Sequence, residues 1–305
     1  MNIRGSLIAG VGLLALLMLG LAPQAQAGTY PFNPCVAGSS NDGGIEAEAT
    51  SGLTEFDPLN PTAPYDFRIV NNCNNGSELK LEGTTSWSNG EAAAMKYETF
   101  AGMGFVGGSF QANEYIFETT GAKVRYWLTN KDGSGAYLLK QPTTGGSTQV
   151  LTSEWPSTPP RQVVKAQIKC ESVSCSTGTR AAWGLIQTTI SDYTAPEYAG
   201  ASGSMFNPGA VSGTRNVKVD GIDGQSGVRS LFVLVNYQWA GIHTVGCTTN
   251  TRVMSPCPQL ASHTFSINTA SAAFQPGVNT LDMCVADYQT AGSFNTTCDR
   301  RYVTK

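Results

Sequence analysis

The chain has 305 residues, with 19 Lys or Arg against 22 Asp or Glu and a net charge of −3. Charged residues make up only 13% of it, about half the ~25% of an average soluble domain, so its surface must consist largely of uncharged polar residues and Gly. Only Arg300 and Arg301 stand together, beside Asp299, and the clustered basic residues that nucleic-acid binding requires are therefore missing.

Residues 1–27 have the pattern of a secretory signal peptide. Arg4 gives a basic start, an almost unbroken apolar run extends from Leu7 to Ala22, and Ala25-Gln26-Ala27 supplies a cleavage site. The run is shorter than the ~20 residues that span a bilayer, which disfavours the alternative of a membrane anchor. No later segment is apolar for long enough to span. We expect a secreted chain, extracellular or at the cell surface, with no membrane span after cleavage.

The cysteines agree with an oxidising compartment. All eight lie after residue 27: Cys35, Cys73, Cys170, Cys175, Cys247, Cys257, Cys284 and Cys298. An even set in a secreted chain predicts disulfides, and the spacing favours pairing neighbours, 35–73, 170–175, 247–257 and 284–298. A zinc site is disfavoured because tight C-x-x-C pairs with His support do not occur.

The apolar pattern after the leader has a period of two residues, which is typical of half-buried strands. In the first part of the chain it predicts the strands Ile45–Ala49, Asp66–Val70, Glu78–Glu82, Lys123–Leu128, Gln162–Cys170 and Ala181–Ile190. Turn pairs such as Asn75-Gly76 and Asp132-Gly133 lie between them. About 165 residues of such strands favour a jelly roll over a smaller sandwich.

A boundary is expected near residues 191–196, where Pro196 interrupts the strand series. The series then restarts with the strands Arg215–Val219, Val228–Asn236, His263–Ile267 and Thr280–Ala286. About a hundred residues of short strands fit an immunoglobulin-like sandwich. The predicted fold class is therefore all-β, with two antiparallel β-sandwich domains in tandem, jelly-roll-like over 28–193 and immunoglobulin-like over 194–305.

Two stretches carry a family likeness. Gly213 to Val219, followed by Asp223 to Val228, resembles the G-T-x-x-V-x-V…D-x-x-S-G-V opening of bacterial immunoglobulin-like domains. The order of Cys170-x4-Cys175, an Ala- and Ile-rich strand, Asp192 to Pro196 and this opening resembles a group of uncharacterised secreted bacterial proteins. In them a jelly-roll-like sandwich precedes an immunoglobulin-like domain. The resemblance covers residues 160–305 best, and it implies a fold and an extracellular role rather than an activity.

The residues for conventional catalysis are sparse, and we predict no catalytic residue. A Ser triad needs a His base, and the only histidines are His243 and His263, with no G-x-S-x-G motif in the chain. Glu46 and Glu48 share one face of a predicted strand and are the candidates for a glycosidase pair. Outward carboxylates that contact solvent are the simpler interpretation, because alternation puts polar residues outside.

Two tryptophans are the candidate ligand-binding residues. Trp87 lies among Thr, Ser, Asn and Gly, and Trp155 follows Thr152-Ser153-Glu154 and precedes Pro156. An exposed ring in such a polar setting can stack on the apolar face of a sugar. Burial of both rings is the alternative, since Trp is on average highly buried.

One turn carries a metal hypothesis. Asp220-Gly221-Ile222-Asp223-Gly224 brings two carboxylates to a turn, and hard cations such as calcium bind several oxygens on turns. A solvated turn is the favoured interpretation, because Asp-Gly is a common turn former. We therefore expect no cofactor, with calcium at Asp220 and Asp223 as the alternative.

These observations favour a secreted or surface-associated binding protein without enzymatic activity, and its most plausible ligand is a polysaccharide or cell-surface glycan. Two other classes stay open. One is an extracellular carbohydrate-active enzyme with a jelly-roll catalytic domain, and the other is a structural or adhesive subunit whose sheet edges pair with another chain.

Overall fold

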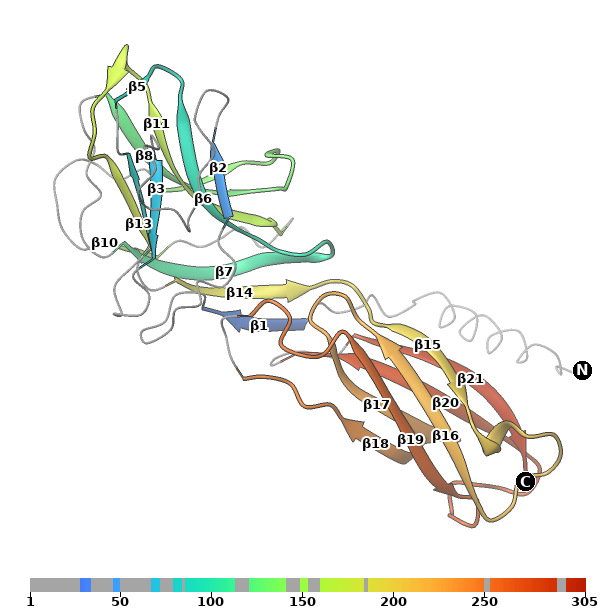
Figure 1. Cartoon of the computed structure of the whole chain (residues 1–305). Helices are drawn as coiled ribbons and strands as arrows, with labels where there is room; N and C mark the ends of the chain where they lie inside the picture. The colour runs from blue at the N-terminus through green and yellow to red at the C-terminus, as the bar shows by residue number, and fades with distance from the viewer. Residues whose placement is uncertain are drawn as a thin grey trace, which may run out of the picture.

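The computed structural model describes residues 28–33, 46–49, 67–71, 79–83, 86–112, 121–140, 149–152, 160–183, 186–249, 253–289 and 295–305. Strands dominate these residues, and the only helical element among them is a single 3-10 turn, η2 (Ser204–Phe206). All strand pairs are antiparallel, so the prediction of an all-β sandwich fold is confirmed. No helix of the described residues is both long and apolar enough to cross a membrane. The strands gather into two bodies, the N-terminal lobe and the C-terminal lobe (Figure 1).

The N-terminal lobe contains four sheets. The largest has the strand order β2-β6-β11-β8-β9, and a four-stranded sheet has the order β1-β14-β7-β10. The two smaller sheets are β13-β4-β3 and β12-β5. In chain order the strands are β1 (Gly28–Phe32), β2 (Glu46–Ala49), β3 (Phe67–Asn71), β4 (Leu79–Gly83), β5 (Trp87–Ser88), β6 (Ala92–Glu98), β7 (Met103–Ala112), β8 (Ala122–Thr129), β9 (Tyr137–Lys140), β10 (Gln149–Thr152), β11 (Val163–Cys170), β12 (Ser174–Cys175), β13 (Arg180–Trp183) and β14 (Ile186–Asp192).

Alternation along the central strands explains how this lobe forms its core. In β8 every second residue from Ala122 to Leu128 is buried, and β11 alternates in the same way. The core that results includes the fully buried rings of Tyr97, Phe105 and Tyr126. One predicted strand, Ala181–Ile190, is divided in the structure, since β13 pairs with β4 whereas β14 pairs with β7 and β1.

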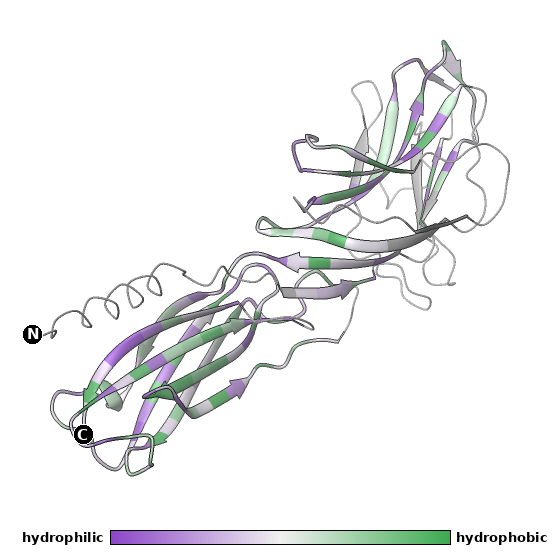
Figure 2. Cartoon of the chain, turned by 180° about the vertical axis from the view of Figure 1, so that it is seen from behind, coloured by the Kyte–Doolittle hydropathy of each residue, from purple (hydrophilic) through white to green (hydrophobic). Residues whose placement is uncertain are grey.

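The C-terminal lobe is a sandwich of two sheets, with strand orders β15-β16-β19 and β18-β17-β20-β21. Its strands are β15 (Glu197–Ser202), β16 (Thr214–Ile222), β17 (Val228–Val235), β18 (Gln238–Thr244), β19 (Leu260–Asn268), β20 (Val278–Asp287) and β21 (Thr296–Thr304). Hydrophobic and hydrophilic residues alternate along these strands, as Figure 2 shows. The inward residues form a second core, which includes Val217, Leu231, Val233, Phe265 and Met283.

A two-residue turn, Asn236-Tyr237, joins β17 to β18. Both residues have positive φ angles, 49° and 66°, as a type I′ hairpin turn requires. The Asn236 side chain holds the turn, because its Oδ1 accepts a hydrogen bond from Thr280 N at 2.9 Å and its Nδ2 donates to Asn279 Oδ1 at 2.7 Å. Asn279 is fully buried.

Three of the four predicted disulfides are confirmed: Cys170–Cys175, Cys247–Cys257 and Cys284–Cys298. Cys284 and Cys298 lie directly opposite each other on β20 and β21. The fourth expected pair, Cys35 and Cys73, lies outside the described residues, as does the predicted signal peptide.

The two lobes contact each other closely. Met254 and Tyr288, which follow the C-terminal lobe's strands, pack against the core of the N-terminal lobe. The Tyr30 hydroxyl on β1 donates a hydrogen bond to Met254 O at 2.6 Å, and Gln225 Nε2 donates to Ala101 O at 3.1 Å. These contacts bring the ends of β14, β16 and β20 to the same region.

Candidate functional site

The outer face of the sheet β18-β17-β20-β21 carries an exposed group of aromatic side chains. Inward residues such as Leu231 and Val233 are buried, so Phe232 and Leu234 point to the other face. The strand register places Ile242 beside Phe232 and Trp239 beside Leu234. The other edge strand, β21, adds to the same face. On it, Arg300 lies opposite Asp282 of β20, and Tyr302 lies opposite Thr280.

The rings of this face are open to solvent. Trp239 is 65% exposed, and Tyr237 and Tyr302 are each 68% exposed. The Trp239 ring leans on Phe232 with 5.0 Å between ring centroids. We call the set Phe232, Tyr237, Trp239, Ile242 and Tyr302 the aromatic face.

A charged pair lies within the aromatic face. Arg300 Nε and Nη2 donate to the two carboxylate oxygens of Asp282 at 2.6 and 3.1 Å, and the guanidinium also lies 4.8 Å from the Tyr237 ring centre. Asp282 and the Tyr237 hydroxyl raise the pKa of Arg300 above its ordinary value. Arg300 is therefore a fixed cation, and its fork of five N–H donors is oriented beside flat rings.

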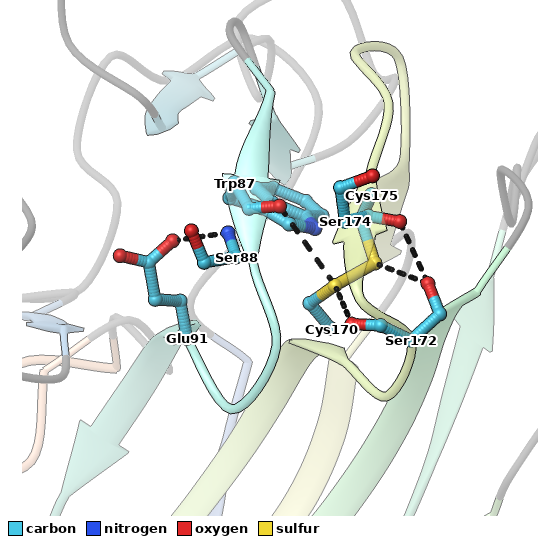
Figure 3. The surroundings of a disulfide bond; sticks show 7 residues. All are labelled: Trp87, Ser88, Glu91, Cys170, Ser172, Ser174 and Cys175. Carbon is cyan, nitrogen blue, oxygen red and sulfur yellow. Dashed lines mark hydrogen bonds between the residues drawn. A yellow bond between two sulfur atoms is a disulfide. The ribbon is translucent and has the colours of Figure 1, made fainter.

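The two predicted ligand-binding tryptophans are not part of this face. Trp87 is only 3% exposed, which makes the prediction of a surface ring there wrong. The reason is that Trp87 and Ser88 form the strand β5 rather than a polar loop, with Trp87 paired to Cys175. Its ring packs over Gly83, where a Cβ atom would lie 2.6 Å from Trp87 Cη2, and it lies beside the Cys170–Cys175 disulfide (Figure 3). Trp155 lies outside the described residues.

The two residues of the metal hypothesis are separated. Asp220 pairs with Lys218 Nζ at 2.8 Å, and its pKa is lowered by hydrogen bonds from Lys218 and Ser262. Asp223 instead follows the end of β16, is 2% exposed, and lies with Asp192 and Asp287 in a buried cluster. The metal hypothesis included neither Asp192 nor Asp287.

Main-chain and side-chain donors hold the three buried carboxylates in place. Asp192 accepts hydrogen bonds from Thr194 N at 2.9 Å and from Ser226 N at 3.1 Å. Ser226 Oγ donates to Asp223 at 3.2 Å. Asn295 donates to both oxygens of Asp287, from its main-chain N at 3.0 Å and from Nδ2 at 2.7 Å.

Burial raises the pKa of all three aspartates. For Asp287 the pKa rises to about 7, and the negative charges of Asp192 and Asp223 contribute to this rise. Burial and the same three carboxylates raise the pKa of the neighbouring Tyr30. The cluster therefore binds a proton or a cation more readily than three solvent-exposed aspartates would.

The candidate glycosidase pair is only partly described. Glu46 on β2 is exposed and pairs with Lys96 at 3.4 Å, an outward ion pair on the sheet. The side chain of Glu48 lies outside the described residues.

The two histidines form a stacked pair. The rings of His243 on β18 and His263 on β19 lie 3.9 Å apart and nearly parallel, so the stack joins the edges of the two sheets. Burial, and then the neighbouring His243, lower the pKa of His263.

We expect this stack to weaken the fold in acid. A His whose pKa is lowered on folding binds its proton more readily in the unfolded chain, so stability falls as the pH drops below the ordinary value of about 6.5. Thermal unfolding at pH 7.5 and pH 5.5 measures the change. The control is the double variant His243→Gln and His263→Gln, whose loss of stability between the two pH values should be smaller than that of the wild type. Equal losses would contradict the prediction.

No protein-family model and no curated protein matches the chain. Several solved structures align with the chain at low TM-scores. The glycoside hydrolase domain of Endo-D from Streptococcus pneumoniae R6 has a TM-score of 0.28 and 12% identity, covering 91% of this chain and 43% of that one. The adhesin domain of Epf from Streptococcus pyogenes has a TM-score of 0.28 and 10% identity, covering 92% of both chains. A GH2 beta-galacturonidase from Eisenbergiella tayi has a TM-score of 0.24 and 7% identity, covering 70% of this chain and 35% of that one. The chain thus spans less than half the length of the two enzyme structures.

Proposed function

We propose that this chain is a secreted or surface-associated binding protein without enzymatic activity, and that the aromatic face binds a polysaccharide. The observation that carries the proposal is the combination of exposed rings with the Arg300–Asp282 pair. Trp239, Tyr237 and Tyr302 offer flat apolar surfaces of the kind that sugar rings stack on. Asp282 fixes the half-exposed Arg300 side chain in place, and Arg300 supplies N–H donors that suit the hydroxyl oxygens of a sugar.

We also propose that the two lobes are the two domains expected from the sequence, 28–193 and 194–305. The sheets β15-β16-β19 and β18-β17-β20-β21 support an immunoglobulin-like assignment for the second. The third, sixth and seventh strands of this lobe, β17, β20 and β21, lie together in one sheet. Strands C, F and G lie together in the same way in the immunoglobulin fold. The jelly-roll-like assignment of the first and the signal peptide stay predictions.

The test applies the mature, oxidised chain to an array of soluble and insoluble polysaccharides and measures retention and released reducing sugar. We expect retention without release. Trp239→Ala should weaken binding about 10- to 100-fold, the effect of removing a central aromatic contact. Because Trp239 is exposed, its fluorescence should also shift when the glycan binds.

The matched control is Phe100→Ala, which removes an exposed ring, 42% accessible, from the N-terminal lobe. This variant should bind the glycan as the wild type does. Release of sugar would support the enzyme class instead. Retention that survives Trp239→Ala and Tyr237→Ala together would overturn the assignment of the aromatic face.

A further inference from the structure

The buried aspartate cluster has the dimensions of a shell around one ion. One carboxylate oxygen from each of Asp192, Asp223 and Asp287 lies within 4.8 Å of the other two. Oxygens that bind one calcium ion at 2.3–2.6 Å can be at most about 5 Å apart. The three carboxylates are therefore close enough to share one ion after small side-chain movements.

Two buried amide oxygens, on side chains whose nitrogen atoms contact the cluster, have no hydrogen-bond partner. They are Asn295 Oδ1 and Gln289 Oε1, both fully buried atoms of residues that are 1% and 9% exposed. Asn295 Nδ2 bridges Asp287 Oδ2 and the main-chain oxygen of Asp192, at 2.7 and 3.1 Å, so this amide lies between two of the carboxylates. Gln289 Nε2 donates to Asp287 Oδ1 at 3.1 Å. Leaving a buried amide oxygen without a partner costs free energy, and amide oxygens are ordinary calcium ligands.

No positive side chain balances the cluster within the described part of the chain. The described ion pairs involve other carboxylates, such as those of Asp220, Asp282 and Asp299. Hydrogen bonds from main-chain N–H groups and from Ser226 orient the three carboxylates but bring no full charge. Buried charges in proteins are paired with opposite charges or coordinate metals.

We propose that Asp192, Asp223 and Asp287 bind one calcium ion between the two lobes, and that the amide groups of Asn295 and Gln289 turn so that Oδ1 and Oε1 replace their nitrogen atoms and complete the protein ligands. An all-oxygen set selects a hard cation over zinc or copper. Five protein oxygens suit calcium, which takes six to eight, better than magnesium, which usually retains several waters.

The position of the ion gives the site a mechanical role. Asp192 ends β14, a strand of the N-terminal lobe, whereas Asp223 and Asp287 follow or end β16 and β20 of the C-terminal lobe. An ion bound to all three therefore crosslinks the lobes at the point where the chain passes between them (Figure 1). This inference is independent of glycan binding, which concerns the opposite end of β20 and the outer sheet face.

The experiment uses the mature chain stripped with a chelator and then titrated with calcium chloride by calorimetry, with magnesium chloride in parallel. We expect one calcium ion per chain, weaker binding of magnesium, and a rise in the unfolding temperature with calcium, as a ligand of the native state requires. Asp287→Asn and, separately, Asp192→Asn should each weaken calcium binding by about 100-fold, since calcium affinity depends on the number of charged ligands.

Asp220→Asn is the matched control. Asp220 lies near the end of β16, as Asp223 does, but it is outside the cluster. This variant should therefore bind calcium as the wild type does. Terbium provides a second measurement that needs no variant. The Tyr30 ring lies beside the cluster, so terbium in the site should luminesce on tyrosine excitation and be displaced by calcium. A folded wild-type chain that binds neither ion would overturn the proposal. Binding that is unchanged in both cluster variants, or preferred binding of magnesium, would overturn it too.

Discussion

Asn279→Ala is expected to destabilise the C-terminal lobe by about 3–4 kcal/mol, at roughly 1 kcal/mol for each hydrogen bond lost. The buried Asn279 side chain makes four such bonds. Its Oδ1 accepts from Gln275 N and Asn236 Nδ2, both at 2.7 Å, and its Nδ2 donates to Gln275 O and Gly277 O at 2.8 and 2.9 Å. Alanine would leave Gln275 N and Gln275 O without these bonds, and it would take one of two partners from Asn236 Nδ2 and from Gly277 O, which keep Ala273 O and Lys305 N.

Denaturant unfolding followed by Trp239 fluorescence measures this effect, because Trp239 is the only tryptophan after residue 183. The control is Asn268→Ala, which removes an exposed side chain that accepts one hydrogen bond, from Ala270 N. That loss should cost no more than about 1 kcal/mol. Similar midpoints for the two variants would contradict the prediction. Since Asn279 also holds Asn236, the Asn279→Ala variant should bind glycan more weakly even where it is folded.

Gly227→Ala is expected to lower the free energy of unfolding by about 3 kcal/mol or more. Gly227 has a φ of 85°, a region where an L side chain costs about 1–2 kcal/mol. A Cβ atom there would also lie 2.5 Å from the carbonyl carbon of Cys257 and closer still to its oxygen, and relieving such overpacking costs a further ~1–3 kcal/mol. The turn that contains Gly227 presents Ser226 N to Asp192, so the change should also weaken calcium binding.

Gly224→Ala is the control for this variant. Gly224 lies in the same turn, but a Cβ atom there would meet nothing within 4 Å. We expect its free energy of unfolding to stay within about 0.5 kcal/mol of the wild type, as for most surface substitutions. Equal losses in the two glycine variants would mean that the turn tolerates a side chain at Gly227.

Much of the fold could be predicted because period-two patterns directly report which side of a strand is buried. The predicted strands Lys123–Leu128 and Gln162–Cys170 correspond to β8 and β11 within two residues at each end. The edge strand β18 escaped prediction, since Gln238 to Thr244 is mostly exposed and lacks alternation. Period alone also could not divide Ala181–Ile190 between two sheets, because that choice depends on distant partners.

The aspartate cluster could not be predicted from local spacing. Asp192, Asp223 and Asp287 come from strand ends separated by long stretches of chain, and only the packing of the two lobes unites them. The sequence does carry one indication of the cluster. Each of the three aspartates ends or directly follows an apolar strand pattern, at a place where a turn is expected. The pair Asp220 and Asp223, by contrast, was chosen for nearness in sequence, but strand alternation turns Asp220 outward.

The exposure of the tryptophans also depends on distant parts of the chain, and local sequence does not reveal it. A polar sequence around Trp87 suggested exposure, but a two-residue strand and a nearby disulfide bury it. Trp239 lies between Gln238 and Ala240 with no distinctive setting, and only its place on an outer sheet face makes it accessible.

The Asn236-Tyr237 turn sets stability against recognition. Type I′ turns favour Gly at their second position, since glycine adopts a positive φ without steric cost. This chain instead has Tyr237 there, with its ring against Arg300. A glycine at this position would adopt the positive φ without steric cost, but it would remove the Tyr237 ring from the aromatic face. The tip of this hairpin is therefore a place where selection for a firmer fold and selection for a better binding surface would choose different amino acids.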